Sequence, residues 1–391
     1  MATTNGKTRN TGELSETYAV LYILGKSKIS LVDGDLRSIP GEMIQFLRLY
    51  RLDETSKRIT YILGNDARGT PTISYDGLSA PVTPVPASEF EKGANELLVL
   101  IRDSAKNKTK TPINAPEVVK ALKLLQSKST SAKSIDKSDF TADVLTRGMA
   151  LHDCGYSIKS ELGAKPTLIN ASKDSSYFEF EVLKNGAPLS VADKGAALAA
   201  GTKPGLETLR GLLAKGFELR FYACPDTLRQ NLAFMDFHGA RFLASVLLEF
   251  LTSAKLGEAR SKKTFWHILQ SLVERVFTEG TANEWWGIAK TPETLYAIFE
   301  RRMREILVCF LSSATVGTLW DGREITKGGM IVVTKLGDVV CLELASRDEL
   351  GKYLVRNCTL ESPSTTKMDW GHVIERDGRL FVRMHLNVRF V

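Results

Sequence analysis

The sequence predicts a protein of the α/β (α+β) class, and three patterns along the chain support this prediction. Strand patterns and helical patterns alternate over roughly the first half of the chain. A run of helical segments then fills residues 206–313, and strand patterns return from residue 330 to the C-terminus. With 391 residues, 43% of them hydrophobic and 25% charged, the chain can bury a sizeable core.

The first half is expected to begin with a helix over residues 10–24, with Gly25 as its stop. Two further helices are predicted: one at residues 88–103, where Ser88 and Glu91 have the spacing of a capping box, and one at 115–125, with Pro116 in its first turn. Alternating apolar residues predict strands at 29–36, 59–63, 72–75, 139–145, 156–160 and 177–183.

The second half is expected to be largely helical and to end in β-strands. Helices are predicted at 206–213, 225–235, 241–251, 264–277 and 292–313, the last with Thr291 as N-cap. Strands are predicted at 379–390 and, as a hairpin, at 330–335 and 339–344. The small-residue-rich stretch at 190–203 suggests a boundary between a domain at 1–195 and a second at 205–391.

Several classes of protein find no support in the sequence. There is no apolar run long enough to cross a membrane, and residues 1–10 are polar, so neither a membrane partner nor a secretory signal is expected. The five cysteines are scattered without a CxxC pair, which favours a reducing cytoplasm over a disulfide framework or a zinc site. The Walker A, GxGxxG and HExxH motifs are absent, so nucleoside triphosphate- and NAD-dependent chemistry lacks support.

The charge distribution indicates a polyanionic partner. The chain carries a net charge of +7, and the segment at 104–137 alone has eight lysines against Glu117 and Asp136, a local charge of +6. This excess lies directly upstream of the acidic strand described next, as suits DNA held over metal ligands. A solvated lysine-rich loop and helix face would have the same composition.

The stretch at 137–183 contains the strongest candidate site. Asp139 and Asp143 share one face of the strand at 139–145, while Ser157 and Lys159 share one face of the strand at 156–160. If the two strands pair, carboxylate, hydroxyl and amine groups converge. Carboxylates can hold Mg²⁺, which activates water for phosphodiester hydrolysis, and a lysine can stabilise the developing charge.

Other polar segments could contact DNA. One follows the lysine-bearing strand and another lies in the loop at 362–371; their candidate phosphate or base contacts are Lys165, Asn170, Ser172, Lys173 and Lys367. Ordinary turns have similar residues. One face of the predicted strand at 379–390 carries Arg379, Arg383 and Arg389, which suits nucleic acid and water equally.

Five sequence pieces together resemble the HpaII-type restriction endonucleases, a branch of the PD-(D/E)xK nucleases. In chain order they are Gly12-Glu13-x-Ser15-Glu16-x-Tyr18, Lys137-x-Asp139-Phe140, Gly155-Tyr156-Ser157-Ile158-Lys159-Ser160-x-Leu162-Gly163, Thr167-Leu168-Ile169-Asn170-Ala171-Ser172 and Arg383-Met384-His385-Leu386-Asn387-Val388-Arg389-Phe390. The pieces touch both ends and the centre of the chain, so the resemblance extends over nearly its whole length.

The resemblance implies a PD-(D/E)xK nuclease core with a mixed central sheet flanked by helices, in residues 1–195. Residues 205–391 would then serve DNA recognition, dimerisation or both. The implied activity is that of a type II restriction endonuclease, with Mg²⁺ as cofactor and double-stranded DNA as substrate. It would cut a short palindrome, CCGG or a related site, leave 5′-phosphates, and act as a homodimer in a prokaryotic cytoplasm.

The resemblance also implies roles for single residues. Asp139 would be the metal-binding aspartate of the motif, Lys159 its lysine, and Glu16 the helix glutamate that many such nucleases add to the metal site. Where the general motif has an acid two residues before the lysine, this sequence has Ser157. Glu16, Asp143 or Glu161 could replace the missing carboxylate, and the sequence does not choose among them. At Glu16, the alternative is that an acid near a helix N-terminus merely complements the helix dipole.

Two other functions fit the same residues. A structure-selective nuclease of repair or recombination would share the site but lack sequence preference. A non-catalytic nucleic-acid-binding protein would hold Asp139 and Lys159 as a simple ion pair, and it would bind DNA without cutting it.

Overall fold

The computed structural model describes residues 8–391 apart from 53–55, 108, 128–136, 164, 202–203, 258–261 and 281–290. Contacts divide the chain into two compact units, Met1–Pro166 with Ile325–Tyr353 and Thr167–Glu324 with Leu354–Val391. These units do not follow the division at 195–205 expected from the sequence. The reason is topological, because a hairpin late in the chain belongs to the sheet of the first unit and residues 167–200 belong to the second.

A nine-stranded mixed sheet forms the first unit. Its strands are β2 (Lys28–Val32), β3 (Ser38–Leu52), β4 (Arg58–Asn65), β5 (Pro71–Asp76), β6 (Val85–Pro86), β8 (Phe140–Thr146), β9 (Met149–Ser160), β14 (Gly328–Val333) and β15 (Val339–Glu343). Their order is β2-β15-β14-β9-β8-β3-β4-β5-β6, and a further pairing of β2 with β3 closes the first six into a ring. Strands β9 and β14 pair in parallel, as do β2 and β15, which confirms the mixed sheet expected from the sequence. A separate short pair joins β1 (Thr8–Arg9) to β7 (Thr111–Pro112).

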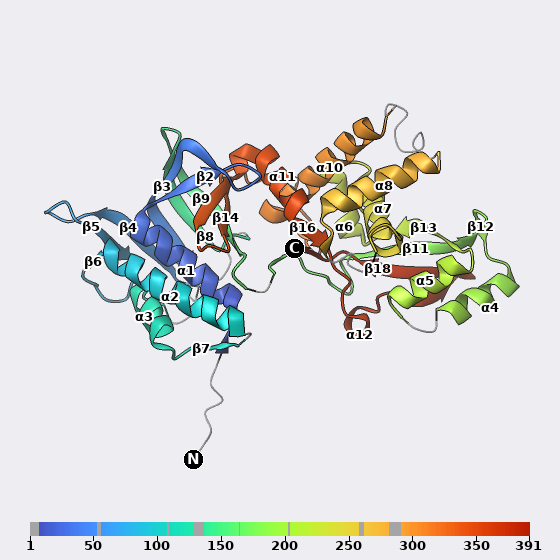
Figure 1. Ribbon diagram of the computed structural model, residues 1–391, viewed down its shortest axis with the longest axis horizontal. Helices are drawn as coiled ribbons and strands as arrows, with labels where there is room; N and C mark the ends of the chain where they lie inside the picture. The colour runs from blue at the N-terminus through green and yellow to red at the C-terminus, as the bar shows by residue number, and fades with distance from the viewer. Residues whose placement is uncertain are drawn as a thin grey trace, which may run out of the picture. The chain divides into compact units, whose positions relative to one another are not determined.

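Helices α1 (Thr11–Lys26), α2 (Ala87–Asn107) and α3 (Pro116–Leu124) pack on one another and on this sheet (Figure 1). All three were predicted from the sequence. Gly25, however, does not stop α1, which ends at Lys26 and is followed by Ser27 in the left-handed conformation, with a φ of 56°. A Cβ at Gly25 would lie 2.8 Å from the backbone nitrogen of Glu91, so this glycine allows α1 and α2 to approach closely.

Strand β3 is the longest of the sheet and was not predicted. Pro40 and Gly41 interrupt its first part, and Arg48 and Arg51 interrupt the apolar alternation of the second. Strand β3 is stabilised by its partners instead of by its own alternation, because β2, β4 and β8 all form backbone hydrogen bonds to it.

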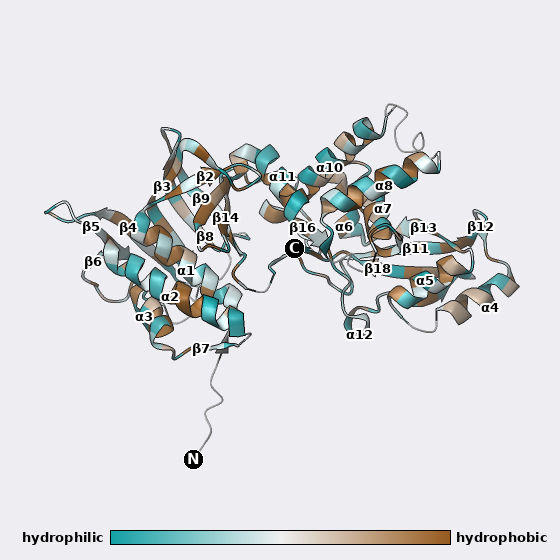
Figure 2. Ribbon diagram, in the orientation of Figure 1, coloured by the Kyte–Doolittle hydropathy of each residue, from teal (hydrophilic) through white to brown (hydrophobic). Residues whose placement is uncertain are grey.

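The predicted hairpin near the C-terminus is confirmed as β14 and β15, which pair antiparallel. Residues Met330, Ile331, Val332 and Val333 of β14 are all 0% exposed. A continuous apolar run of this kind is typical of a strand covered on both faces, and most of β14 has the brown colour of hydrophobic residues in Figure 2. The 3₁₀ turn η2 (Leu344–Ser346) and helix α11 (Arg347–Asn357) follow, and the second unit resumes within α11.

The second unit contains two further sheets. One has the order β12 (Ala187–Pro188), β11 (Tyr177–Lys184), β18 (Arg379–His385), β17 (Val373–Arg376), with β13 (Glu218–Ala223) also paired to β11. The other has the order β10 (Thr167–Ile169), β19 (Val388–Phe390), β16 (Cys358–Leu360). The single strand expected at 379–390 is therefore wrong: the chain leaves one sheet after β18 and joins the other at β19.

The predicted helices of this half are confirmed as α5 (Leu206–Ala214), α6 (Asp226–Met235), α7 (Gly239–Thr252), α8 (Phe265–Thr278) and α10 (Pro292–Ser312). Thr291 caps α10 by accepting a hydrogen bond from the backbone N–H of Thr294. The small-residue stretch at 190–203 contains helix α4 (Val191–Ala200), and a single turn, α12 (Thr365–Met368), lies in the later loop.

Within the described part of the chain, no helix combines the length and the hydrophobicity needed to span a membrane. All five cysteines are buried and none forms a disulfide.

Candidate active site

The two strands of the candidate site form an antiparallel hairpin, β8 and β9, with Phe140 opposite Tyr156. The rings of these two residues stack with centroids 5.3 Å apart, and Phe46 of β3 packs against both. Buried aromatic packing therefore fixes the register that aligns Asp139 with the residues around Ser157.

Asp139 lies immediately before β8 and is held by the neighbouring strand. The backbone N–H of Ile158 donates to Asp139 Oδ2 at 2.6 Å, so the carboxylate acts as a hydrogen-bond acceptor for β9 where the β8 ladder begins. Burial raises the pKa of Asp139 above its ordinary value. The positive charge of Lys159 opposes this rise in pKa, and so does a hydrogen bond from Ser157. The structure thus brings Asp139, Ser157 and Lys159 together.

Glu16 reaches the same place from helix α1. Asn10 fixes the start of this helix, because its side chain accepts the backbone N–H of Glu13 at 2.9 Å. Glu16 is half-buried, and burial raises its pKa to about 7, with the nearby charge of Asp139 as the next contribution. The negative charge of Asp139 therefore acts on Glu16, as expected for two carboxylates that lie near each other.

Arg51 of β3 completes this cluster and was missed by the sequence-based reasoning. Its side chain is buried, with 4% of the residue exposed, and it hydrogen-bonds Tyr61. Its charge lowers the pKa of both Glu16 and Asp139, as does that of Lys159. The only sequence signal was an arginine among apolar residues in a stretch with no predicted strand. We call Glu16, Arg51, Asp139, Ser157 and Lys159 the carboxylate–lysine cluster.

Asp143 and Glu161 do not lie in this cluster. Where Asp143 lies, the pairing of β8 with β9 is irregular, and two residues of β9, His152 and Asp153, stand opposite this one residue of β8. Asp143 accepts hydrogen bonds from Tyr50 at 2.6 Å and from the backbone of Asp153 at 3.2 Å. Glu161 instead accepts the backbone N–H of Lys335 at 3.2 Å. Of the three carboxylates left open by the sequence, Glu16 is the one whose pKa is raised by the charge of Asp139, whereas the pKa of Asp143 is governed by burial, Tyr50, Asp153 and His152.

The residues predicted to contact DNA lie in both units: Lys165, Asn170, Ser172, Lys173 and Lys367. Lys165 belongs to the first unit, and the others belong to the second. Asn170 and Lys367 are exposed, whereas Lys173 forms an ion pair with Asp369 at 2.6 Å. The backbone N–H of Ser172 donates to the hydroxyl of Ser176. In the lysine-rich segment, Lys120 pairs with Glu96, and residues 128–136 lie outside the described residues.

The donor set of the cluster fits a hard divalent cation. Glu16 and Asp139 provide two carboxylates, both with raised pKa values that a cation would relieve. Where residues are described, no group of three or more His, Cys, Asp or Glu side chains could hold a metal by itself. Two carboxylates suit Mg²⁺, which is usually bound through one or two of them together with waters and substrate phosphates.

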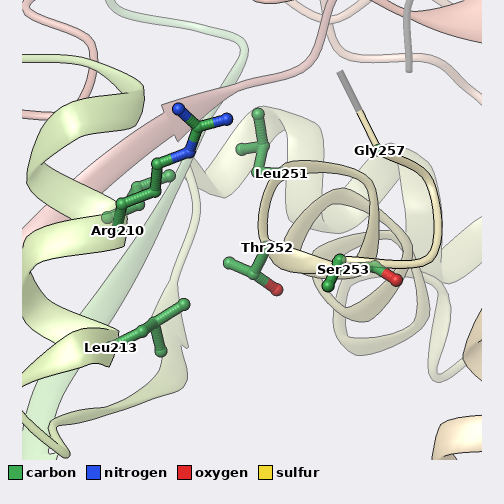
Figure 3. A pocket seen from close by; sticks show the side chains of 8 residues that line it. Arg210, Leu213, Leu251, Thr252, Ser253 and Gly257 are labelled. Atoms are coloured by element: carbon green, nitrogen blue, oxygen red, sulfur yellow. The ribbon is translucent and has the colours of Figure 1, made fainter. Parts of the chain in front are cut away.

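A separate pocket of about 330 Å³ lies in the second unit between α5 and the end of α7. Figure 3 shows Arg210 and Leu213 on one side, with Leu251, Thr252 and Ser253 on the other. Among the described residues that line it, Arg210 is the only charged one. This pocket therefore lacks the acids and bases that hydrolysis needs.

Replacing Glu16 by glutamine is expected to stabilise the metal-free protein at alkaline pH. Below pH 4.5 the carboxyl is protonated in both the folded and the unfolded chain, whereas between 4.5 and about 7 only the folded chain keeps the proton. Stability is therefore lost as the pH rises through this window. Because Glu16 is partly exposed, the gain in unfolding free energy for Glu16→Gln at pH 8 should be about 2 kcal/mol, and near zero at pH 4.

Thermal unfolding in EDTA at the two pH values measures this difference. Glu161→Gln, which changes a half-buried carboxylate outside the cluster, serves as the control and should alter stability little at either pH. An equal effect of Glu16→Gln at both pH values would contradict the assigned environment of Glu16.

Comparisons with known proteins point to one family. A sequence model of the HpaII restriction endonuclease family matches residues 10–390. The chain is 25% identical to the type II restriction enzyme HpaII of Haemophilus parainfluenzae over 385 residues, 98% of each protein. No solved structure matches the chain significantly. The chain therefore belongs to the HpaII restriction endonuclease family and is a type II site-specific nuclease.

Proposed function

We propose that this enzyme hydrolyses double-stranded DNA at a short palindromic site, CCGG or a related sequence, with Mg²⁺ as cofactor and with 5′-phosphate products. The observation that carries the proposal is the convergence of Glu16 and Asp139 with Lys159 on the β8–β9 hairpin and helix α1. Membership of the HpaII restriction endonuclease family supports DNA as the substrate, and type II restriction enzymes generally use divalent metal ions.

In this proposal Asp139 and Glu16 hold the cation, and Glu16 supplies the carboxylate that Ser157 does not. When bound, Mg²⁺ polarises the scissile phosphate and lowers the pKa of a water molecule. Lys159 orients the attacking water and stabilises negative charge that develops on the phosphoryl oxygens. Ser157 keeps the Asp139 carboxylate ionised and oriented through its hydrogen bond. We assign the surrounding fold, a mixed sheet flanked by helices, to the PD-(D/E)xK core.

Arg51 has an electrostatic role in this proposal. Its buried charge lowers the pKa values of Glu16 and Asp139 and so keeps them available for a cation at neutral pH. Arg51→Met should shift the acidic limb of the pH–rate profile to higher pH and slow cleavage about tenfold at neutral pH. Arg51→Lys should restore most of the rate, since it keeps the charge. Single-turnover rates between pH 6 and 9 measure the shift, and an unchanged profile for Arg51→Met would remove Arg51 from the site.

The proposed substrate contacts outside the cluster are Lys165, Asn170, Ser172, Lys173 and Lys367, through phosphates or base edges. A homodimer would match the two-fold symmetry of a palindrome, with one carboxylate–lysine cluster for each strand. We assign the first unit to catalysis and the second to DNA recognition, dimerisation or both.

Incubation of the purified protein with a plasmid of known sequence, with Mg²⁺ or with EDTA, tests the proposal. Mg²⁺ should yield discrete fragments whose ends map to one palindrome and carry 5′-phosphates. Fragments without a common sequence would favour a structure-selective nuclease, and intact plasmid that the protein nevertheless binds would favour a non-catalytic role.

A further inference from the structure

One face of the larger sheet in the second unit is rich in arginines. Phe178 and Phe180 of β11 point to the opposite face, as does Val182, and helix α4 reaches that face where its end at Gly201 meets Val373. The alternate positions of β11, β13, β17 and β18 include two glutamates and four arginines, beside apolar residues such as Phe381 and Ile374. We call these charged residues the arginine face: Glu179, Glu181, Arg220, Arg376, Arg379 and Arg383.

The first of the two glutamates anchors two of the arginines. Glu179 is 2% exposed and accepts hydrogen bonds from Arg376 and, at 3.1 Å, from Nε of Arg383. A buried carboxylate needs such partners because removing its charge from water costs free energy unless hydrogen bonds replace those to water. The guanidinium groups nevertheless reach solvent, with 41% of the Arg376 side chain and 28% of the Arg383 side chain exposed.

The second glutamate repeats the arrangement with the other two arginines. Glu181 is also 2% exposed and accepts from Arg220 at 2.9 Å and from Arg379 at 3.3 Å. The side chains of these arginines are 60% and 46% exposed. Each guanidinium has five N–H donors, and the glutamates use only some of them, so donors remain directed to solvent.

Aromatic rings fix the planes of these guanidinium groups. Arg376 stacks on Phe381 with its central carbon 4.5 Å from the ring centroid, and Arg383 stacks on Tyr177 at 4.4 Å. Tyr222, which is 48% exposed, lies between Arg376 and Arg379. Stacking and carboxylate bonds together hold the arginines in place before any ligand binds, which reduces the entropy lost on binding.

The charge of the arginine face identifies the partner. Four guanidinium groups against two carboxylates leave a net charge of +2, whereas one arginine for each glutamate would have sufficed to neutralise the buried acids. A second copy of the chain would bring the same positive surface to a two-fold interface, which disfavours dimerisation there. Planar, exposed arginines match phosphates and the O6 and N7 atoms of guanine, which they bind with two parallel hydrogen bonds.

We propose that the arginine face is a DNA-recognition surface of this nuclease, on which Arg220 and Arg379 contact the bases or phosphates of the duplex. This inference rests on the proposed function only for which DNA sequence is bound. The arginine face itself is a feature of the structure and does not depend on that proposal. Sheets that read DNA grooves with side chains from adjacent strands provide the general precedent.

Binding of the full-length protein to two fluorescent duplexes in EDTA tests the inference, one with CCGG and one with the same bases scrambled. Arg220→Ala and Arg379→Ala should each weaken binding at least about tenfold. A loss confined to the CCGG duplex assigns base contacts, and an equal loss on both assigns phosphate contacts. Either single replacement leaves Glu181 one arginine, and melting temperatures verify that the variants fold.

The matched control is Arg229→Ala. Arg229 on α6 is 59% exposed and pairs with Asp226 at 2.9 Å, much as Arg220 pairs with Glu181, but it lies outside the arginine face. Unchanged DNA affinity in folded Arg220→Ala and Arg379→Ala would overturn the inference, and so would a loss of self-association in sedimentation with DNA affinity intact. If the wild-type protein does not cut plasmid but these variants still bind DNA more weakly than it does, the proposed function is rejected and the DNA-binding role of the arginine face is kept.

Discussion

Replacing Asp139 by asparagine is expected to abolish DNA cleavage, with a loss of at least about 10³-fold, while DNA binding and folding persist. Asparagine lacks the charge that a divalent cation requires, yet its carbonyl oxygen can still accept the N–H of Ile158. The hydrogen bond that positions the residue is therefore kept, and only the charge is removed. Single-turnover cleavage of plasmid with Mg²⁺ and duplex binding in EDTA measure the two properties separately.

The matched control for this replacement is Asp143→Asn, since asparagine can still accept the hydrogen bond from Tyr50. Asp143 lies outside the carboxylate–lysine cluster, so the Asp143→Asn enzyme should cut at close to the wild-type rate. Normal cutting by Asp139→Asn together with loss of cutting by Asp143→Asn would mean that the metal-binding aspartate has been assigned to the wrong position.

Lys159→Met is expected to lower the cleavage rate by about 10²- to 10⁴-fold without a comparable loss of DNA affinity. Methionine keeps much of the length of the side chain but removes its ammonium group. Charge developing on the phosphoryl oxygens would then lack its stabilising partner, and the pKa values of Asp139 and Glu16 would lose one of the influences that lower them.

Lys335→Met is the control for Lys159, because Lys335 is an exposed lysine of the same unit, next to Glu161. It should cut normally. A Lys159→Met enzyme that cuts at the wild-type rate, or that loses cleavage only in proportion to its DNA affinity, would contradict a catalytic role for this lysine.

Local patterns were sufficient to predict several parts of the cluster. The helix that carries Glu16 was evident from its periodicity and its cap, and the alternation of apolar residues marked both strands around Asp139 and Lys159. These features depend on neighbours within a few residues along the chain, and so they can be recognised from a single sequence.

Other parts depend on contacts between distant segments and could not be predicted in this way. Strand β3, and with it Arg51, is stabilised by pairing with β2, β4 and β8 rather than by its own alternation. Strand β14 was expected as half of a hairpin, but it also pairs in parallel with β9, which places Ile331 beside Ile158. Along the sequence these two residues are separated by a long segment of the second unit. Periodicity contains no information about such partners.

The choice of the second carboxylate shows the same limit. Asp143 shares the sequence alternation of Asp139, and the sequence left it open as a ligand. In the structure Asp143 instead accepts a hydrogen bond from Tyr50, 93 positions away along the chain, and an alternating pattern contains no information about such a partner. Glu16 comes near Asp139 because helix α1 packs on the sheet, and the sequence alone does not show this packing.

The position of a bound cation tests the central claim most directly. Crystals of the protein with uncut duplex and Mn²⁺, measured at the manganese absorption edge, should show an anomalous peak between the carboxylates of Asp139 and Glu16, on the side of Lys159. A peak at Asp143 or Glu161 with none at Asp139 would contradict the assignment of the carboxylate–lysine cluster as the catalytic centre.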